Sequence, residues 1–128
     1  MKNLIVVTLS FTSMNTFAEW TKVSEYQATT FYIDFASIQK HNDKGRIQSL
    51  NNESSGKPSD YTSIKTLTEY DCNAHTSQIL TLNHYNKTMA IGNPVVDSEV
   101  SFYPKFPVNL NAKTIDGLEF ELVCGIKS

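Results

Sequence analysis

Hydrophobic and polar residues alternate along most of this chain, in short runs that polar turn sequences separate. Alternation with a period of two is typical of β-strands that bury one face. Because few stretches show the longer spacing of an amphipathic helix, we expect one antiparallel, meander-like sheet of five to seven strands with at most one or two helices. The pattern predicts strands over residues 20–26, 29–33, 46–51, 61–72, 76–85 and 95–103.

Polar and proline-containing stretches mark the connections between these runs. Residues 34–38 are predicted to form a tight turn, because the side chains of Asp34 and Ser37 can bond nearby backbone. Residues 41–45 form a second turn sequence, and residues 51–60 contain the longest loop signal. Pro104 and Pro107 are predicted to close the strand over residues 95–103. Trp20, at the start of the first run, is predicted to anchor the core.

The C-terminal segment, residues 111–124, fits two interpretations. Apolar residues at every second position from Leu118 to Cys124 alternate with two glutamates, which favours a strand. Ile115 and the two leucines also fit the apolar stripe of a helix, with Asn111 as its N-cap. Gly117 weakens the helical interpretation by about 1 kcal/mol. The alternation therefore favours a strand slightly, and both interpretations stay open at this point.

The first residues have the order of a secretory signal peptide. Lys2 supplies a positive charge, the run from Leu4 to Phe11 is apolar, and Ala18 offers a small residue for cleavage. We expect residues 1–18 to be the signal peptide, cleavage between Ala18 and Glu19, and a single domain over residues 19–128. A spanning helix would need about 20 predominantly apolar residues, and polar residues interrupt this run, so no membrane span is expected.

The predicted export decides how the two cysteines are interpreted. Cys72 and Cys124 are the chain's two cysteines, and both lie in the predicted mature chain. In an oxidising compartment they are expected to form one disulfide. The bond would close a loop of about 53 residues, worth roughly 4 kcal/mol in the chain-entropy model. No cysteine lies near the cleavage point, so the protein is expected to be periplasmic or secreted and not lipid-anchored.

Charge and composition exclude several classes of partner. Removal of Lys2 leaves ten Lys and Arg residues against thirteen Asp and Glu, a net charge of −3, and Arg46 is the one arginine. No basic run or basic face stands out, which argues against nucleic acid and anionic lipid as partners. Fourteen aromatic residues and a mean hydropathy of −0.30 are typical of a folded chain.

The sequence contains no catalytic or metal-binding motif that would indicate an enzyme. It lacks a Gly-rich phosphate loop, a Gly-x-Ser-x-Gly elbow, a His-Glu-x-x-His and a Cys-x-x-Cys. His41 lies in a polar turn and is predicted to be solvated. His75 and His84 are nine residues apart on one predicted strand and would face opposite ways, so no shared metal site is expected. We therefore predict no catalytic residue, no metal site and no cofactor.

Three further groups of residues are weaker candidates for a site. Glu69 and Asp71 are the nearest approach to an acid–base pair, without a visible third partner. The segment containing His84, Tyr85 and Met89 would suit a haem or metal crevice, which gives the alternative of a periplasmic small-ligand or haem-binding protein. Aromatic residues beside prolines suit either a docking patch or cover for the sheet; these are Tyr103 and Phe106.

Several short signatures occur in a recognisable order. They are an aromatic-Ile-Asp-x-x-Ser-Ile segment at residues 32–38, Ser-x-Lys at 63–65, Glu-Tyr-Asp-Cys at 69–72, Met-x-x-Gly at 89–92 and a closing Val-Cys at 123–124. In this order and spacing, over nearly all of the mature chain, they resemble the surface-adhesin protein E family of small exported proteobacterial proteins. The resemblance implies an α+β fold, with a C-terminal helix packed on a single antiparallel meander sheet and a disulfide between Cys72 and Cys124.

The same resemblance implies a non-enzymatic binding function. The family's best-known activity is adhesion to host extracellular-matrix and serum proteins such as vitronectin, laminin and plasminogen, with formation of a homodimer. Two features depart from the family pattern: the lipid-anchor cysteine is absent, and Ser49 and Tyr103 stand nearest to positions where members often carry tryptophan. No binding residue is transferred from the family, and a periplasmic domain of unassigned activity remains the further alternative.

Overall fold

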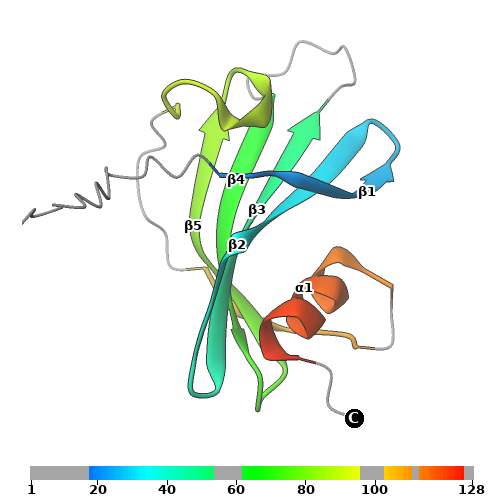
Figure 1. The fold of residues 1–128 in the computed structure, drawn as a ribbon, viewed down its shortest axis with the longest axis vertical. Coiled ribbons are helices and arrows are strands. Elements are labelled where there is room, and N and C mark those ends of the chain that lie inside the picture. Colours follow the sequence, from blue (N-terminus) through cyan, green and yellow to red (C-terminus); the bar gives the residue numbers. More distant parts are fainter. Residues whose placement is uncertain (1–17, 54–61, 96–102, 111–112, 126–128) are drawn as a thin grey trace, which may run out of the picture.

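A single antiparallel sheet forms the body of the protein (Figure 1). The computed structural model describes residues 18–53, 62–95, 103–110 and 113–125. Within these residues six strands follow one another in chain order, each hydrogen-bonded to the next. The strands are β1 (Thr21–Tyr26), β2 (Thr29–His41), β3 (Lys44–Glu53), β4 (Ser63–Asp71), β5 (Thr76–Tyr85) and β6 (Lys105–Pro107). The predicted signal peptide, apart from Ala18, lies outside the described residues.

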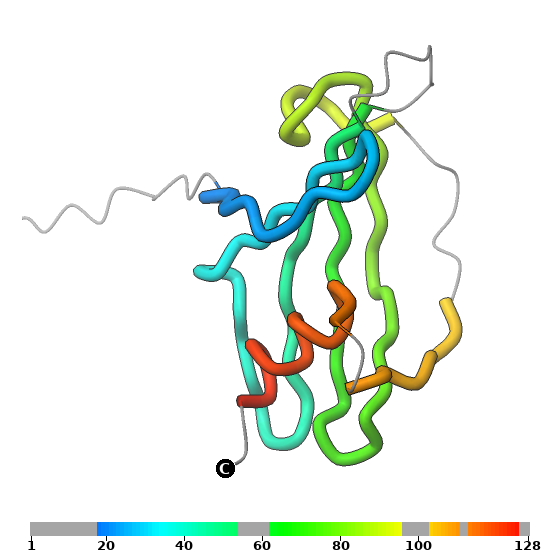
Figure 2. The backbone as a smooth tube through the Cα atoms, turned by 90° about the vertical axis from the view of Figure 1, so that its right-hand side faces the viewer, coloured from blue at the N-terminus to red at the C-terminus, as the bar shows by residue number. Residues whose placement is uncertain are grey.

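Two helical segments cover opposite faces of this sheet. The α-helix α1 (Ile115–Cys124) contacts β2, β3 and β4, and the short 3-10 helix η1 (Thr88–Ala90) contacts β3, β4 and β5. Figure 2 shows β1 crossing the sheet above α1, so that β1 and α1 lie on the same side of the central strands. None of the described helices is long and apolar enough to span a membrane. The predicted α+β meander fold is confirmed.

The core lies between α1 and the sheet. Phe120 packs edge-on against the ring of Tyr70, with ring centroids 6.1 Å apart. Gly45 of β3 packs directly against α1, and a Cβ atom at this position would collide with Cγ1 of Val123. The buried cluster consists of Ile33, Ile47, Tyr70, Val108, Phe120 and Val123. Trp20 is half-buried and is not a buried member of this cluster, so the prediction of a core anchor there is wrong.

The C-terminal segment is a helix, as the family resemblance implied and against the slight preference of its alternating pattern. Thr114 is the N-cap, since its hydroxyl accepts a hydrogen bond from the Gly117 N–H at 3.0 Å. The helix ends at Gly125, whose positive φ of 83° suits glycine and whose N–H donates to the carbonyl of Glu121. The predicted N-cap, Asn111, lies outside the described residues.

The tight turn predicted at residues 34–38 is an irregularity inside a continuous strand. The pairing of β2 with β3 shifts register between Asp34 and Gln39. The expected local bonds do form: the Ala36 N–H donates to the Asp34 carboxylate at 3.1 Å, and the Ser37 hydroxyl donates to the Asp34 carbonyl at 2.6 Å. The Ser37 hydroxyl also accepts from the Gln48 N–H on β3, at 2.8 Å. This bond links β2 to β3 within the irregularity, so β2 continues as one strand on both sides of it.

The last strand differs from its predicted position. Of the run predicted over residues 95–103, most lies outside the described residues, and Val95 forms an isolated bridge with His84. Strand β6 begins directly after Pro104 and ends at Pro107, the two prolines predicted to close that run, and Pro107 pairs with Thr76. Proline is tolerated here because β6 is an edge strand of the described sheet, where the backbone N–H groups on the outer side pair with no neighbouring strand.

Candidate binding surface

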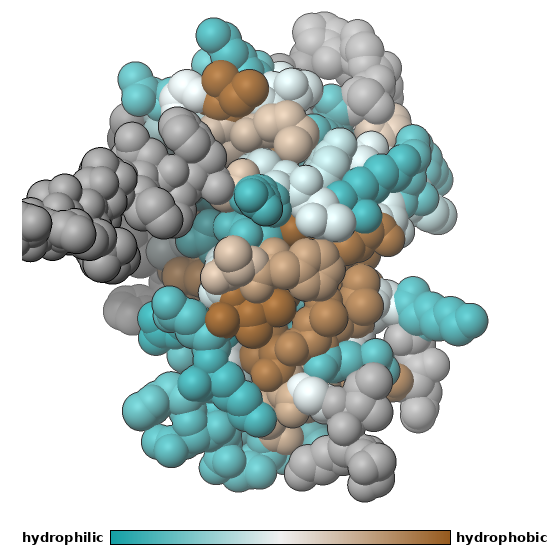
Figure 3. Space-filling view, in the orientation of Figure 1, coloured by the Kyte–Doolittle hydropathy of each residue, from teal (hydrophilic) through white to brown (hydrophobic). Residues whose placement is uncertain are grey.

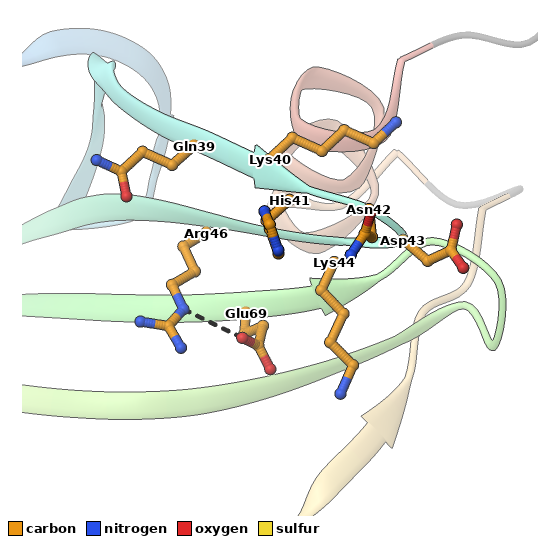
Figure 4. A pocket seen from close by; sticks show the side chains of 8 residues that line it. All are labelled: Gln39, Lys40, His41, Asn42, Asp43, Lys44, Arg46 and Glu69. Carbon is orange, nitrogen blue, oxygen red and sulfur yellow. Dashed lines mark hydrogen bonds and ion pairs between the residues drawn. The ribbon is translucent and has the colours of Figure 1, made fainter.

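The hairpin that joins β2 to β3 projects from one end of the sheet and lines a shallow hollow of about 660 Å³. Its turn consists of Asn42 and Asp43, and Asn42 has a left-handed φ of 59°, a conformation that asparagine tolerates better than most residues. His41 is exposed here, as predicted for a solvated histidine. Figure 4 shows the lining side chains, which are Gln39, Lys40, His41, Asn42, Asp43, Lys44, Arg46 and Glu69.

Positive charge slightly exceeds negative charge in this hairpin hollow. Arg46 forms an ion pair with Glu69 at 3.1 Å, in which the Arg46 side chain is 52% exposed and that of Glu69 is 18% exposed. Asp43 accepts a hydrogen bond from the side chain of Asn73 at 2.8 Å. Lys44 and Arg46 therefore supply the cationic groups of this hollow, whereas the Lys40 ammonium lies at the end of α1, with its Nζ 3.4 Å from the carbonyl oxygen of Cys124. Such a surface can bind an acidic segment of another protein by charge complementarity.

A second, smaller hollow lies behind the same hairpin, beside the disulfide. Its volume is about 420 Å³, and it shares Lys40 and Asp43 with the hairpin hollow. The disulfide joins Cys72, next to the β4–β5 turn, to Cys124 at the end of α1, with their Cα atoms 5.6 Å apart. The predicted disulfide is thus present, and it brings the end of α1 beside the two hairpin turns. We call this hollow the disulfide hollow.

A third hollow is an apolar groove between β1 and α1, of about 760 Å³. Figure 3 shows brown, apolar side chains gathered over α1 and below β1. Two of its lining residues are notably exposed: Tyr26 at 67% and Leu110 at 41%. The groove has an apolar floor and few charged groups, so it offers contact area rather than a specific polar contact.

His84, Tyr85 and Met89 do not line a common crevice among the described residues. His84 and Tyr85 are successive residues of β5, so their side chains point to opposite faces of the sheet. Tyr85 is buried, and the Nζ of Lys65 lies 5.9 Å from its ring centroid. The Met89 sulfur accepts a hydrogen bond from the side chain of Asn52 at 2.9 Å. None of the three hollows described above is lined by His84, Tyr85 or Met89.

The carboxylates at residues 69 and 71 do not form an acid–base pair. Glu69 pairs with Arg46, whereas the Asp71 carboxylate accepts from the backbone N–H groups of Ala74, at 2.9 Å, and Asn73, at 3.0 Å. These bonds, chiefly the one from Ala74, and the nearby lysines lower the pKa of Asp71 below its usual value. Asp71 therefore shapes the β4–β5 turn. Among the described residues, no group of three or more His, Cys, Asp or Glu is placed to hold a metal ion.

The two aromatic residues beside the prolines have different environments. Tyr103 is half-buried, and its carbonyl accepts from the Gln78 side chain at 2.8 Å. Phe106, on edge strand β6, is 56% exposed. Of these two residues, Phe106 is therefore the one that presents its ring to solvent, and it lines none of the three hollows described above.

Sequence reasoning missed one buried polar pair beneath α1. The Tyr70 hydroxyl donates to Oε1 of Glu119 at 2.7 Å, and Glu119 is only 2% exposed. Burial raises the pKa of Glu119 to about 7, and burial together with this carboxylate raises the pKa of Tyr70. Oε2 of Glu119 has no hydrogen-bond partner among the described residues. The signal in the sequence was weak, since Glu119 and Glu121 looked alike in the alternating pattern and only the helix separates their environments.

Comparisons with known proteins agree with this fold. A family model described as surface-adhesin protein E matches residues 20–125. Two solved structures are similar: crystal form II of Haemophilus influenzae protein E, at TM-score 0.59 and 14% identity, covering 73% of this chain and 79% of that one; and protein E from non-typeable Haemophilus influenzae, at TM-score 0.58 and 12% identity, covering 83% and 84%. No curated protein matched the sequence. Because the family model spans most of the chain, the protein belongs to the surface-adhesin protein E family.

Proposed function

We propose that this protein is an exported, non-enzymatic adhesin that binds host extracellular-matrix or serum proteins, with vitronectin, laminin and plasminogen as the partners to test. The observation that carries the proposal is the family match over residues 20–125. The surface is compatible with it, since the described residues offer shallow hollows against which another protein can dock.

We further propose that the hairpin hollow makes the first contact with the partner. The hairpin that forms it projects from the end of the sheet, and the ammonium group of Lys44 and the guanidinium of Arg46 line it. Charged groups at the rim of an interface mainly increase the association rate and set the orientation of the partner. The corresponding partner surface would be acidic.

The membership of a surface-adhesin family implies an exported protein. We propose cleavage between Ala18 and Glu19 and release into the periplasm or the medium without a lipid anchor. Fractionation of the native protein among surface, periplasm and medium tests this, together with the mass of the mature chain. A mature chain that still carries residues 1–18 would contradict the cleavage.

The direct test is binding of the exported protein to immobilised vitronectin, laminin and plasminogen at micromolar concentrations. We expect saturable binding to at least one of them, weakened when Lys44 and Arg46 are both changed to glutamate. A Lys22→Glu and Lys87→Glu variant, with the same change in charge at exposed positions outside the hairpin hollow, is the matched control. Absence of binding to all three would remove the adhesin proposal and leave an exported domain of unassigned activity.

The family resemblance also suggests a homodimer. Sedimentation of the exported protein over a concentration series tests this proposal independently of any host protein. A species of constant monomer mass at all concentrations would refute it.

A further inference from the structure

The disulfide hollow has an apolar floor. Phe120 and the Cys72–Cys124 disulfide line it, and the His75 ring lies edge-on to Phe120 with ring centroids 5.3 Å apart. Leu110 adds an aliphatic side chain that is 41% exposed. This floor can take the hydrocarbon part of a side chain out of water, but Phe120 itself is only 6% exposed, so the hollow is shallow above it.

The rim of the same hollow is acidic. Asp43, in the β2–β3 turn, and Glu121, in the last turn of α1, line it, and both residues are exposed. The C-terminus of α1 adds the partial negative charge of its last carbonyl groups. The described residues supply one lysine to this lining, Lys40, and its Nζ lies 3.4 Å from the carbonyl oxygen of Cys124. Lys40 therefore shows that this helix end accepts an ammonium group.

The two hollows on either side of the hairpin thus differ in the sign of their charge. Lys40 and Asp43 line both hollows, so the difference comes from Lys44, Arg46 and Glu69 in the hairpin hollow and from Glu121 and the C-terminus of α1 in the disulfide hollow. A long cationic side chain matches the disulfide hollow at both ends, because its hydrocarbon stem suits the floor and its charged tip suits the rim. An acidic or purely apolar side chain would satisfy only one of these features.

We propose that the disulfide hollow binds a single arginine or lysine side chain of a basic peptide segment in a partner protein. The inference rests on the proposed binding function and adds the chemistry of the segment that is bound. It also assigns Lys40 a competing role, since its ammonium group occupies the helix end that the incoming cation would use.

The test is a titration of the isotope-labelled exported protein with a blocked glycine peptide that carries one central arginine, followed by backbone amide NMR. We expect saturable shifts at Asn73, Glu121 and Gly125 and none with the matching peptide that carries glutamate. Glu121→Gln should weaken the arginine peptide about two- to fivefold, the size of an exposed ion pair, whereas Lys40→Gln should strengthen it. Both substitutions lie at exposed positions, so the fold should survive them.

The matched control is Glu25→Gln, which makes the same change in charge at an exposed position of β1, outside the disulfide hollow. Equal weakening by Glu25→Gln and Glu121→Gln would overturn the proposal, as would equal binding of the arginine and glutamate peptides or shifts confined to other parts of the protein.

The peptide titration needs no host protein, so the two proposals can fail separately. Binding to laminin or vitronectin without any arginine-peptide shift would overturn this inference and leave the adhesin function standing. Arginine-peptide binding in the disulfide hollow without host-protein binding would support the site and refute the adhesin function.

Discussion

The sheet is covered on opposite faces by two segments that are held in different ways. Helix α1 packs an apolar cluster onto β2, β3 and β4, and a disulfide holds its end. Helix η1 contains no buried residue and is held by hydrogen bonds to side chains of β3 and β4. Asn52 accepts from the Met89 N–H at 2.8 Å, and Ser63 accepts from the Ala90 N–H at 3.0 Å.

The difference shows how one sheet uses two sources of stability. Burial is non-directional, and a fully buried large apolar side chain is worth about 1.5–3 kcal/mol. A hydrogen bond contributes about 0.5–1.5 kcal/mol net but fixes direction. Direction matters at η1, because Met89 and Ala90 have left-handed backbone φ angles of 61° and 54°, which residues other than glycine rarely adopt. We therefore expect α1 to dominate global stability and η1 to depend on a few specific partners.

The largest expected effect comes from emptying the core beneath α1. Phe120→Ala should destabilise the protein by about 3–5 kcal/mol, because it leaves a cavity between the rings of Tyr70 and His75. Urea unfolding measures the change, with Phe106→Ala, at a position 56% exposed, as the control. A loss from Phe120→Ala no larger than that of the control would show that α1 does not hold the core.

Removal of the disulfide should have the next largest effect. A Cys72→Ser and Cys124→Ser variant should lose about 2–4 kcal/mol, because the unfolded chain is no longer constrained by the loop. Thermal melting with and without dithiothreitol gives the same comparison for the unmodified protein, while the double serine variant should not respond to the reductant. An unchanged melt of the unmodified protein after complete reduction would contradict the expectation.

The buried glutamate beneath α1 predicts a dependence of stability on pH. The folded-state pKa of Glu119 is raised from 4.5 to about 7, so the folded protein holds this proton more tightly than the unfolded chain. The resulting stability is fully present below about pH 4.5 and is lost as pH rises through about 7, by roughly 3 kcal/mol in total. Glu119→Gln removes the titrating group, so its urea midpoint should change less than that of the unmodified protein between pH 5 and pH 7.5. Parallel pH profiles would refute this role for Glu119.

The smallest expected effect concerns η1. Asn52→Ala removes the acceptor of the Met89 N–H and the donor to the Met89 sulfur, and should cost about 1–3 kcal/mol. Hydrogen exchange of the Met89 and Ala90 amides should accelerate in this variant, while amides of α1 keep most of their protection. Asn93→Ala, at an exposed position nearby, is the control and should change neither quantity. Equal acceleration throughout the sheet would mean that η1 is not a separate unit.

Local patterns predicted much of the sheet, because each strand pairs with the next strand in the sequence, and alternation and turn residues indicate such pairs. They failed where a contact distant in sequence decides the local structure. The local hydrogen bond of the Ser37 hydroxyl to the Asp34 carbonyl is typical of a turn that ends a strand. The same hydroxyl also accepts from the Gln48 N–H on β3, and β2 therefore continues as one strand. In α1, alternation pointed to a strand, but the inward side chains of Phe120 and Val123 are three residues apart.

By itself, the sequence determined the meander and the disulfide, since strands joined by short turns pair with their neighbours and two cysteines in an exported chain have one possible pairing. Only the tertiary structure decided that α1 packs over Gly45 and buries Glu119. It alone brought two turns and the end of α1 together around the disulfide hollow. Such sites are formed by residues far apart in the chain. These residues come together because apolar surface is buried over the whole fold, and a local sequence pattern does not contain that information.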